Sequence, residues 1–409
     1  MKKHALCIMV LAGILLMSGC GGQQDVHNEL VQKPDSVSAA DDDLNTDDII
    51  KLYQEIYDEV TASYTVDGIQ SLETIENIIK RLGEHGYSAI DSGNQVDMVQ
   101  KEQVLRFCES IEQSKEAQLT IWVVDTPEKL YGYHLSTEEG KVDVVKEHYQ
   151  YNNVCFVKAG SVRYTADSWQ YTNEGYLIFT GSSYSEQSYV LTMSDVPEVT
   201  ALRVEPLDIK CRELNRLYML PIGYGRNNMF LCDWSGDDYD ELDFYDAFDR
   251  FYSMIYGQPV PYLPDENINI GAVYQIPEEE FENMLMKYLP ADKDRIRSHT
   301  KYVSEKKVYE YRPRGFYEAE YTNIPYPEVV DYVTNDDGTV TLTVNAVYPS
   351  ESTSKAYTHE VVVRPLEDGG FQYVSNKMLP SKDDYSTSWH TDRLTEEEWE
   401  KIYEENSGG

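Results

Sequence analysis

The first apolar pattern in the folded part of the chain has the period of an α-helix. In residues 45–60, apolar positions such as Ile49, Tyr53 and Ile56 fall on one face. Two later segments repeat this spacing, so helices are predicted over 45–60, 71–86 and 97–113.

From residue 118 the period shortens to that of β-strands. Apolar runs are separated by short polar turns such as "TEEG" and "TNEG", which is typical of an antiparallel meander. Strands are predicted over 118–124, 129–135, 141–151, 152–160, 175–181, 188–194 and 200–207. After them, 209–220 is predicted to be helical and 227–234 to be a strand.

The second half of the chain carries the clearest pattern. A helix is predicted over 276–289, followed by four strands with turns at "TNDDG" and "EDGG". In the second of these strands Val340, Leu342, Val344 and Ala346 alternate with Thr339, Thr341, Thr343 and Asn345. One face of this meander is therefore expected to be buried and the other wet.

These elements predict an α+β protein, with N-terminal helices plus an antiparallel sheet, then a smaller helix-plus-meander domain. By analogy, the smaller domain is expected to resemble the cone-shaped nuclear-transport-factor-like or cystatin-like folds. The predicted division is a signal peptide at 1–19, a lipidated flexible tether at 20–45, an α+β domain at 46–257, a linker at 258–271, the helix and meander domain at 272–380 and an acidic tail at 381–409.

The N-terminus indicates where the protein is located. Lys2 and Lys3 precede an apolar run that is too short to span a membrane, and the run ends in "LMSGC" at Cys20. This ending resembles the lipobox of bacterial lipoproteins, in which the cysteine is lipid-modified and becomes the first mature residue. The resemblance implies a membrane-attached protein on the extracytoplasmic side, held by lipid at Cys20; an ordinary secreted protein is the alternative.

More widely, residues 270–400 resemble uncharacterised lipoproteins of anaerobic Gram-positive bacteria. The lipobox, "DGTVTLTVNAVYP", "THEVVVRPLEDGGFQYVSN" and "RLTEEEWEKI" are the segments that carry the resemblance. It supports the extracytoplasmic location and implies no catalytic residue.

The net charge limits the kinds of partner that the protein can bind, and the cysteine content limits its possible disulfides. The formal net charge of −37 disfavours nucleic acid as a partner. Outside the cytoplasm, Cys108, Cys155, Cys211 and Cys232 either form disulfides, in one of three connectivities, or remain buried thiols. Cys155 and Cys232 lie in apolar runs that predict buried strand positions.

Familiar catalytic motifs are absent from the sequence. It contains no phosphate-binding loop, no serine-hydrolase elbow and no Cys/His zinc spacing. No cofactor is therefore expected, and an enzymatic role is disfavoured.

The acidic stretch "CDWSGDDYDELDFYDAFDRFY" is the strongest exception. Asp233, Asp237 and Glu241 have spacing like that of calcium ligands, although the glycine stands two places too early for an EF-hand loop. The favoured interpretation is a helix start capped by Ser235 or Asp237. That helix is predicted to bury Phe244, Phe248, Phe251 and Ile255 and to end at Gly257.

A tyrosine-rich segment, 302–332, is the other candidate site. Tyr311, Arg312, Arg314 and Tyr317 are predicted to be partly exposed and to converge on one groove, because tyrosine and arginine are enriched at binding hot spots. Replacing both arginines with alanine is then expected to weaken binding while stability stays within about 1 kcal/mol. These expectations hold if the segment forms a binding groove; the favoured interpretation is a sheet edge packed by amphipathic tyrosines.

Three functions remain open at this point. The leading hypothesis is a lipid-anchored protein that binds a ligand or an envelope partner, either a protein or a glycan. The second is a glycan or cell-wall hydrolase with a carboxylate pair drawn from Asp237, Asp238 and Glu241. The third is a structural or assembly factor of an envelope complex.

Overall fold

The computed structural model describes residues 43–62, 70–263, 272–320, 323–380 and 389–406. Within these ranges, α-helices accompany a seven-stranded mixed sheet and two smaller antiparallel sheets, so the predicted α+β class is confirmed. Residues 49–409 form one compact unit, and the packing described below lies within it.

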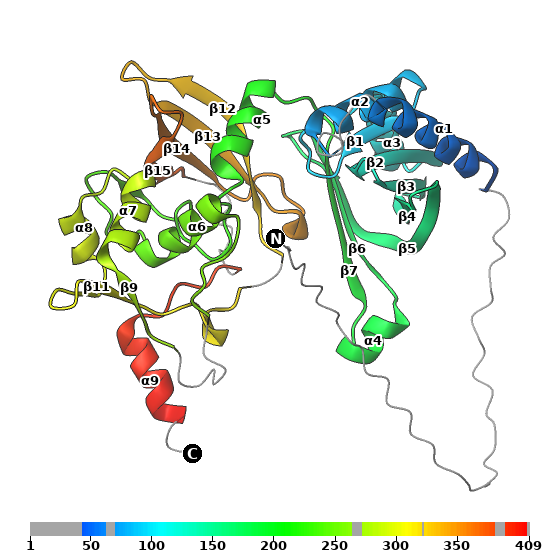
Figure 1. Cartoon of the computed structure of the whole chain (residues 1–409). Helices are drawn as coiled ribbons and strands as arrows, with labels where there is room; N and C mark the ends of the chain where they lie inside the picture. The colour runs from blue at the N-terminus through cyan, green and yellow to red at the C-terminus, as the bar shows by residue number, and fades with distance from the viewer. Residues whose placement is uncertain (1–42, 63–69, 264–271, 321–322, 381–388, 407–409) are drawn as a thin grey trace, which may run out of the picture. The chain divides into compact units, whose positions relative to one another are not determined.

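The seven strands of the large sheet lie side by side in sequence order (Figure 1). They are β1 (Ser88–Asp91), β2 (Ala117–Thr126), β3 (Lys129–Glu138), β4 (Lys141–Tyr151), β5 (Phe156–Tyr171), β6 (Tyr176–Ser183) and β7 (Val196–Arg203). β1 pairs in parallel with β2, and every later neighbour is antiparallel, as the short polar turns predict.

Three helices cover this sheet: α1 (Asp43–Thr61), α2 (Leu72–Glu84) and α3 (Lys101–Glu112). β2 shows why its sequence is an almost unbroken apolar run. Trp122 and Val124 join the cluster that contains α1 and α2 residues, whereas Ile121 and Val123 join the cluster that contains α3 residues. Both faces of the strand are covered, so apolar residues are favoured at every position rather than at alternate ones.

The turn "TEEG" closes a two-residue hairpin between β3 and β4. Glu139 and Gly140 have φ values of 51° and 80°. Two consecutive positive values are typical of a type I′ turn, whose twist matches that of the flanking strands. The predicted turn is confirmed here with its physical basis.

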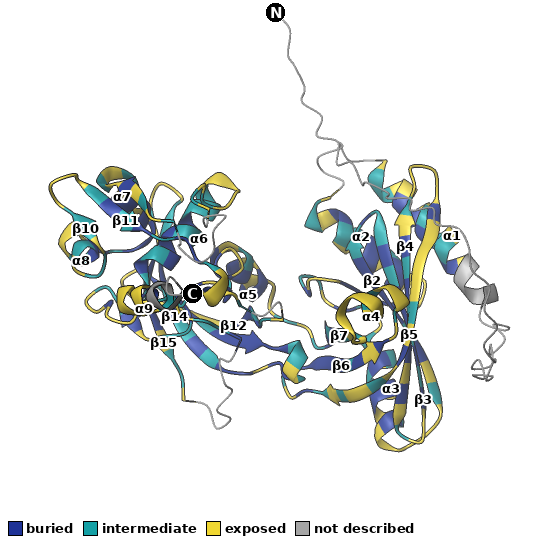
Figure 2. Ribbon diagram, turned by 90° about the horizontal axis from the view of Figure 1, so that it is seen from below, coloured by how far each residue is buried: buried dark blue, intermediate teal, exposed yellow. Residues whose placement is uncertain are grey.

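The connection between β6 and β7 departs from prediction. The segment 188–194 is predicted to be a strand, but helix α4 (Glu186–Thr192) occupies most of it. The Ser185 side chain caps the helix by accepting a hydrogen bond from the Ser188 amide. No residue of α4 is buried, and Figure 2 shows the helix exposed. The apolar residues that predict a strand here therefore lie on an exposed helix.

The predicted four-stranded meander is confirmed as β12 (Tyr326–Thr334), β13 (Val340–Val347), β14 (Thr358–Pro365) and β15 (Phe371–Met378). A fifth strand, β8 (Trp234–Ser235), pairs with β15. β8 is all that remains of the strand predicted over 227–234, since residues 229–232 form turns.

The predicted alternation over 339–346 is correct at three of the four apolar positions, with Val340 only partly buried, and wrong at two of the four polar positions. Leu342, Val344 and Ala346 are buried, but so are Thr339 and Asn345. Asn345 accepts a hydrogen bond from Thr358, which satisfies its side chain inside the protein. The second face is covered near this end of the sheet, where Val347 packs with Tyr176 and Ile178 of β6.

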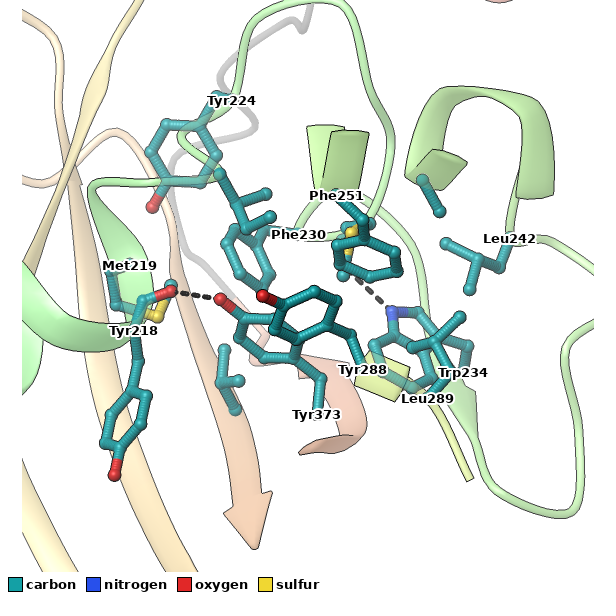
Figure 3. Close-up of a cluster of buried hydrophobic side chains, with 14 of the residues drawn as sticks. Tyr218, Met219, Tyr224, Phe230, Trp234, Leu242, Phe251, Tyr288, Leu289 and Tyr373 are labelled. Carbon is teal, nitrogen blue, oxygen red and sulfur yellow. Dashed lines mark hydrogen bonds between the residues drawn. The ribbon is translucent and has the colours of Figure 1, made fainter. Parts of the chain in front are cut away.

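The five-stranded sheet packs against a core rich in aromatic residues (Figure 3). Helices α5 (Ile209–Leu214), α6 (Phe244–Tyr256), α7 (Glu278–Tyr288) and α8 (Lys293–Ser298) and a π-helix η1 (Asn215–Met219) contribute to this core. Two 3-10 turns, η2 (Phe316–Glu318) and η3 (Pro349–Glu351), lie outside it, and η3 contacts β6 and β7. A three-stranded sheet of β9 (Tyr274–Pro277), β10 (Tyr302–Val303) and β11 (Val308–Tyr311) completes the core, and α9 (Glu396–Asn406) ends the described chain.

Residues before and after the predicted linker share this core. Phe230 and Phe251 belong to the same cluster as Tyr288 and Tyr373, and Figure 3 shows these rings together. α6 therefore packs with the meander rather than with the seven-stranded sheet. Part of the predicted linker, 264–271, lies outside the described residues.

All four cysteines of the described chain are free thiols. Cys108 and Cys211 are buried, as one of the two interpretations expects, and Cys232 is partly buried. Cys155 is exposed, so its predicted burial is wrong. It precedes β5 in a turn held by Asn152, whose side chain accepts hydrogen bonds from the Val154 and Cys155 amides.

The predicted signal peptide and Cys20 lie outside the described residues. Among the helices that the structure describes, none is long and apolar enough to cross a membrane.

Candidate functional site

The acidic stretch forms a tight turn before it becomes a helix. Ser235 and Asp238 exchange backbone hydrogen bonds, and the Asp233 carboxylate accepts one from the Met378 amide. Asp237 and Glu241 are exposed. Among the residues that the structure describes, no three His, Cys, Asp or Glu side chains are grouped closely enough to hold an ion. The structure thus does not bring Asp233, Asp237 and Glu241 together.

The predicted helix is correct at its end and wrong at its start. α6 ends at Gly257, as predicted, and buries Phe244, Phe248 and Phe251, while Ile255 is partly buried. Its N-cap, however, is Asp243, whose carboxylate accepts hydrogen bonds from the Tyr245 and Asp246 amides. The earlier residues cannot start the helix because the Ser235–Asp238 turn and buried Tyr239 and Leu242 hold them in another conformation.

The first turn of α6 is the centre of a buried ion network. Asp246 accepts two hydrogen bonds from Arg314, at 2.9 Å from Nε and 2.5 Å from Nη2. Arg393 donates to Asp246 at 3.0 Å and to Asp249 at 2.9 Å. The Tyr311 hydroxyl donates to Asp249 at 2.7 Å. Three acidic residues, counting Asp243, thus meet two arginines. The side chains of Asp246 and of both arginines are buried, whereas those of Asp243 and Asp249 are partly exposed.

Two of the predicted binding residues belong to this network. Tyr311 and Arg314 are buried, so the expectation that both are partly exposed is wrong. The physical reason is that Asp246 and Asp249, far away in sequence, are their partners. Tyr317 is 44% exposed and contacts Phe316 edge to face, and Arg312 is partly buried. The four side chains therefore do not converge on one groove.

Arg312 instead lines a pocket of about 480 Å³, here called the Trp399 pocket. Its other lining residues are Tyr245, Ser298, His299, Thr300, Lys301, Glu310, Arg393, Leu394, Glu396 and Trp399. The volume lies within the range of about 300–1,000 Å³ that is usual for small-ligand sites. Tyr245 and Arg393 connect the pocket to the buried network, because the Arg393 guanidinium lies 5.8 Å from the Tyr245 ring centre.

Charges of both signs meet in the Trp399 pocket. The Lys301 ammonium lies 3.0 Å from a Glu310 oxygen and also contacts the Glu396 carboxylate. A second contact brings Arg312 within 3.8 Å of the same Glu396 oxygen. The Arg312 guanidinium also lies 5.6 Å from the Trp399 ring centre, within cation–π distance. Contacts with Lys301 lower the pKa of Glu396, so the carboxylate stays ionised.

Sequence reasoning missed α9, which supplies Glu396 and Trp399 to the pocket. The segment is predicted to be an acidic tail, yet "TEEE" at Thr395 is a capping box. Thr395 Oγ1 accepts a hydrogen bond from the Glu398 amide, and the Glu398 carboxylate accepts one from the Thr395 amide. That signal was present in the sequence. By contrast, the role of Arg393 had no local signal, because its partners are on α6.

A pH-dependent effect is expected at Asp243. Burial, and then the nearby Asp246 charge, raise the pKa of Asp243 to about 6. The folded state therefore binds the proton more tightly than the unfolded state, so this contribution to stability is present at low pH and is lost as pH rises through about 6. Between pH 5 and 7.5 the free energy of unfolding of the wild type is expected to fall by about 1.4 kcal/mol relative to Asp243→Asn.

Urea unfolding of both proteins at the two pH values checks this expectation. Asparagine caps a helix as well as aspartate does, so the comparison isolates the titration. A constant difference between the two proteins across this pH range would contradict the assignment.

Neither the curated proteins nor the solved structures contain a match to the chain. A family model described as "Family of unknown function (DUF6070)" matches residues 39–393, which include the large sheet, the meander and the buried ion network. The chain therefore belongs to this family of unknown function, DUF6070.

Proposed function

We propose that this protein is a lipid-anchored, extracytoplasmic binding protein whose ligand is a small zwitterion, an amino acid or short peptide, held in the Trp399 pocket. The lipobox ending at Cys20 supports the location. The absence of familiar catalytic motifs from the sequence supports binding rather than catalysis. At the level of fold, α7 followed by the meander supports the analogy with nuclear-transport-factor-like or cystatin-like folds, which carries no function.

The observation that carries the proposal is the position of Glu396. Its carboxylate lies against Lys301 and near Arg312, so these two cations already contact a carboxylate of the chain itself. Glu396 is 51% exposed and belongs to the first turn of α9. An exposed ion pair contributes only about 0–1 kcal/mol, so a ligand carboxylate can take its place at small cost.

The presence of both positive and negative side chains in the Trp399 pocket favours a zwitterion over a simple anion. A net charge of −37 disfavours the approach of an anion to the protein as a whole. When a ligand carboxylate binds Lys301 and Arg312, the Glu310 carboxylate loses part of its pairing with Lys301. An ammonium group on the same ligand restores that pairing, and Trp399 supplies an aromatic surface for its apolar part.

Rigid surroundings support the same role. Arg393 lines the pocket, donates to the Arg312 carbonyl and is held on its other side by Asp246 and Asp249. The backbone that carries Arg312 is thus fixed before a ligand arrives, which lowers the entropy lost on binding.

Calorimetric titration of the full-length protein in detergent tests the proposal, with dipeptides that have free termini as probes. Arg312→Ala is expected to weaken binding by about tenfold, because a charge-assisted hydrogen bond contributes about 1.5–3 kcal/mol. Glu396→Gln is expected to strengthen binding, because it removes the competing carboxylate. N-acetylated and C-amidated forms of the same dipeptides are expected to bind more weakly.

Arg163→Ala is the matched control, since Arg163 is an exposed arginine on β5 that does not line the pocket. It is expected to leave the affinity unchanged. If free and capped dipeptides bind equally, or if Arg312→Ala and Arg163→Ala behave alike, the zwitterion proposal fails.

A further inference from the structure

A second pocket, of about 530 Å³, lies where β6 and β7 meet β12. We call it the Asn215 pocket. It is lined by residues of the 92–95 loop, by Tyr176, Val199 and Ala201, by Asn215 and Leu220 near the π-helix, by 323–324 and 326–328, and by Pro349 and Ser350. None of these residues lines the Trp399 pocket, so the two sites are independent.

Among the described residues that line the Asn215 pocket, Glu328 is the only charged one, and its charge is already compensated. Its carboxylate accepts a hydrogen bond from Arg203 at 2.7 Å and another from the Tyr176 hydroxyl at 2.6 Å. All three side chains are buried. A bound ion would therefore enter a pocket with no unpaired opposite charge, which is unfavourable at a buried site.

The remaining polar groups of the lining are amides and hydroxyls. Several of them fix the wall itself. Asn94 Nδ2 donates to the Ala201 carbonyl at 3.1 Å and to the Tyr326 hydroxyl at 3.4 Å, and Asn94 Oδ1 accepts from the Arg203 amide. The wall is thus a hydrogen-bonded framework rather than a set of loose surface side chains.

Asn215 differs from the others. The side chain is only 4% exposed, and its Nδ2 donates to the Pro327 carbonyl at 3.1 Å. Its Oδ1, however, has no hydrogen-bond partner among the described residues. A buried acceptor without a donor costs about 1–3 kcal/mol. Asn215 also begins a π-helix, a distortion that occurs frequently at functional sites.

We infer that the Asn215 pocket binds a neutral, hydroxyl-rich ligand of the size of a mono- or disaccharide. Hydroxyl groups both donate and accept, so they can pair with the accessible amides and hydroxyls of the lining. The prolines, Leu220 and Ile324 provide apolar surface for the carbon-bound hydrogens of such a ligand. Neutrality follows from the compensation of Glu328.

Calorimetric titration of the full-length protein in detergent tests this inference. The probes are glucose, N-acetylglucosamine and maltose, with glucuronate and glucosamine as charged counterparts. At least one neutral sugar is expected to bind, and its charged counterparts more weakly. Asn215→Leu is expected to weaken that binding by about tenfold, because it removes an amide from the lining and frees the Pro327 carbonyl that Asn215 holds in the wall.

A second pair of variants tests the pocket without changing the hydrogen bonds of its wall. Leu220 is 42% exposed and lines the pocket, whereas nearby Leu217 is 52% exposed and does not line it. Leu220→Trp should obstruct the pocket and lower affinity, and Leu217→Trp should leave it unchanged. Equal affinity in Leu220→Trp and Leu217→Trp, preference for the charged sugars, or no binding of any neutral sugar would overturn the inference.

Discussion

Replacing Arg314 with alanine is expected to lower the free energy of unfolding by about 3–5 kcal/mol. The Arg314 and Asp246 side chains are 2% and 1% exposed, and their bidentate pairing is out of reach of water. Removing the guanidinium leaves Asp246 with Arg393 alone and deprives the Thr391 carbonyl of its donor. Urea unfolding at pH 7.5 measures the loss.

This result reverses the expectation drawn from the sequence, in which replacement of Arg312 and Arg314 leaves stability nearly unchanged. Arg312→Ala is the matched control, because the Arg312 side chain is 27% exposed and its ion pair with Glu396 is long. It is expected to change stability by about 1 kcal/mol or less. A loss below about 1 kcal/mol in Arg314→Ala as well would mean that the network is not buried as described.

The double variant Asp246→Leu with Arg314→Leu separates loss of the pair from exposure of a lone charge. Removing both charges is expected to cost less than the sum of the two single changes, because neither partner is left alone. Additive losses would indicate that the pair contributes through packing only.

Replacing Cys20 with alanine is expected to transfer the protein from the membrane fraction to the medium or the soluble envelope fraction. The lipid is the sole proposed attachment, and the helices of the described chain include none that could cross a membrane. Acyl chains stabilise membrane attachment by about 0.8 kcal/mol per buried methylene, so loss of the anchor has a large effect. Cell fractionation followed by immunoblotting measures the distribution.

Cys155→Ala serves as the matched control for this experiment. Cys155 is the exposed cysteine of the described chain and is not expected to contribute to attachment. The Cys155→Ala protein should stay in the membrane fraction. Retention of Cys20→Ala in that fraction would refute lipid anchoring, whatever the outcome of the binding experiments.

Patterns with a short period were enough to predict much of the fold. The four meander strands, the apolar run of β2 and the buried phenylalanines of α6 were all predicted correctly. A period of two or of 3.6 residues reports which side of an element faces the core, and neighbouring residues alone determine it. The same reasoning failed at α4, where apolar residues lie on an exposed helix and no core selects a strand.

The candidate site depended on contacts between distant residues. Arg314 finds Asp246 across 68 positions of the chain, and Arg393 finds it across 147. Nothing local distinguishes these arginines from the exposed Arg163. A charge pattern shows which residues are available, but only packing decides which charges lose their water and must pair. The sequence alone thus predicted the class of fold, which is confirmed, and a lipid anchor at Cys20, which stays a prediction. Tertiary structure decided that Tyr311 and Arg314 are buried supports and that Arg312 lines a pocket with Trp399.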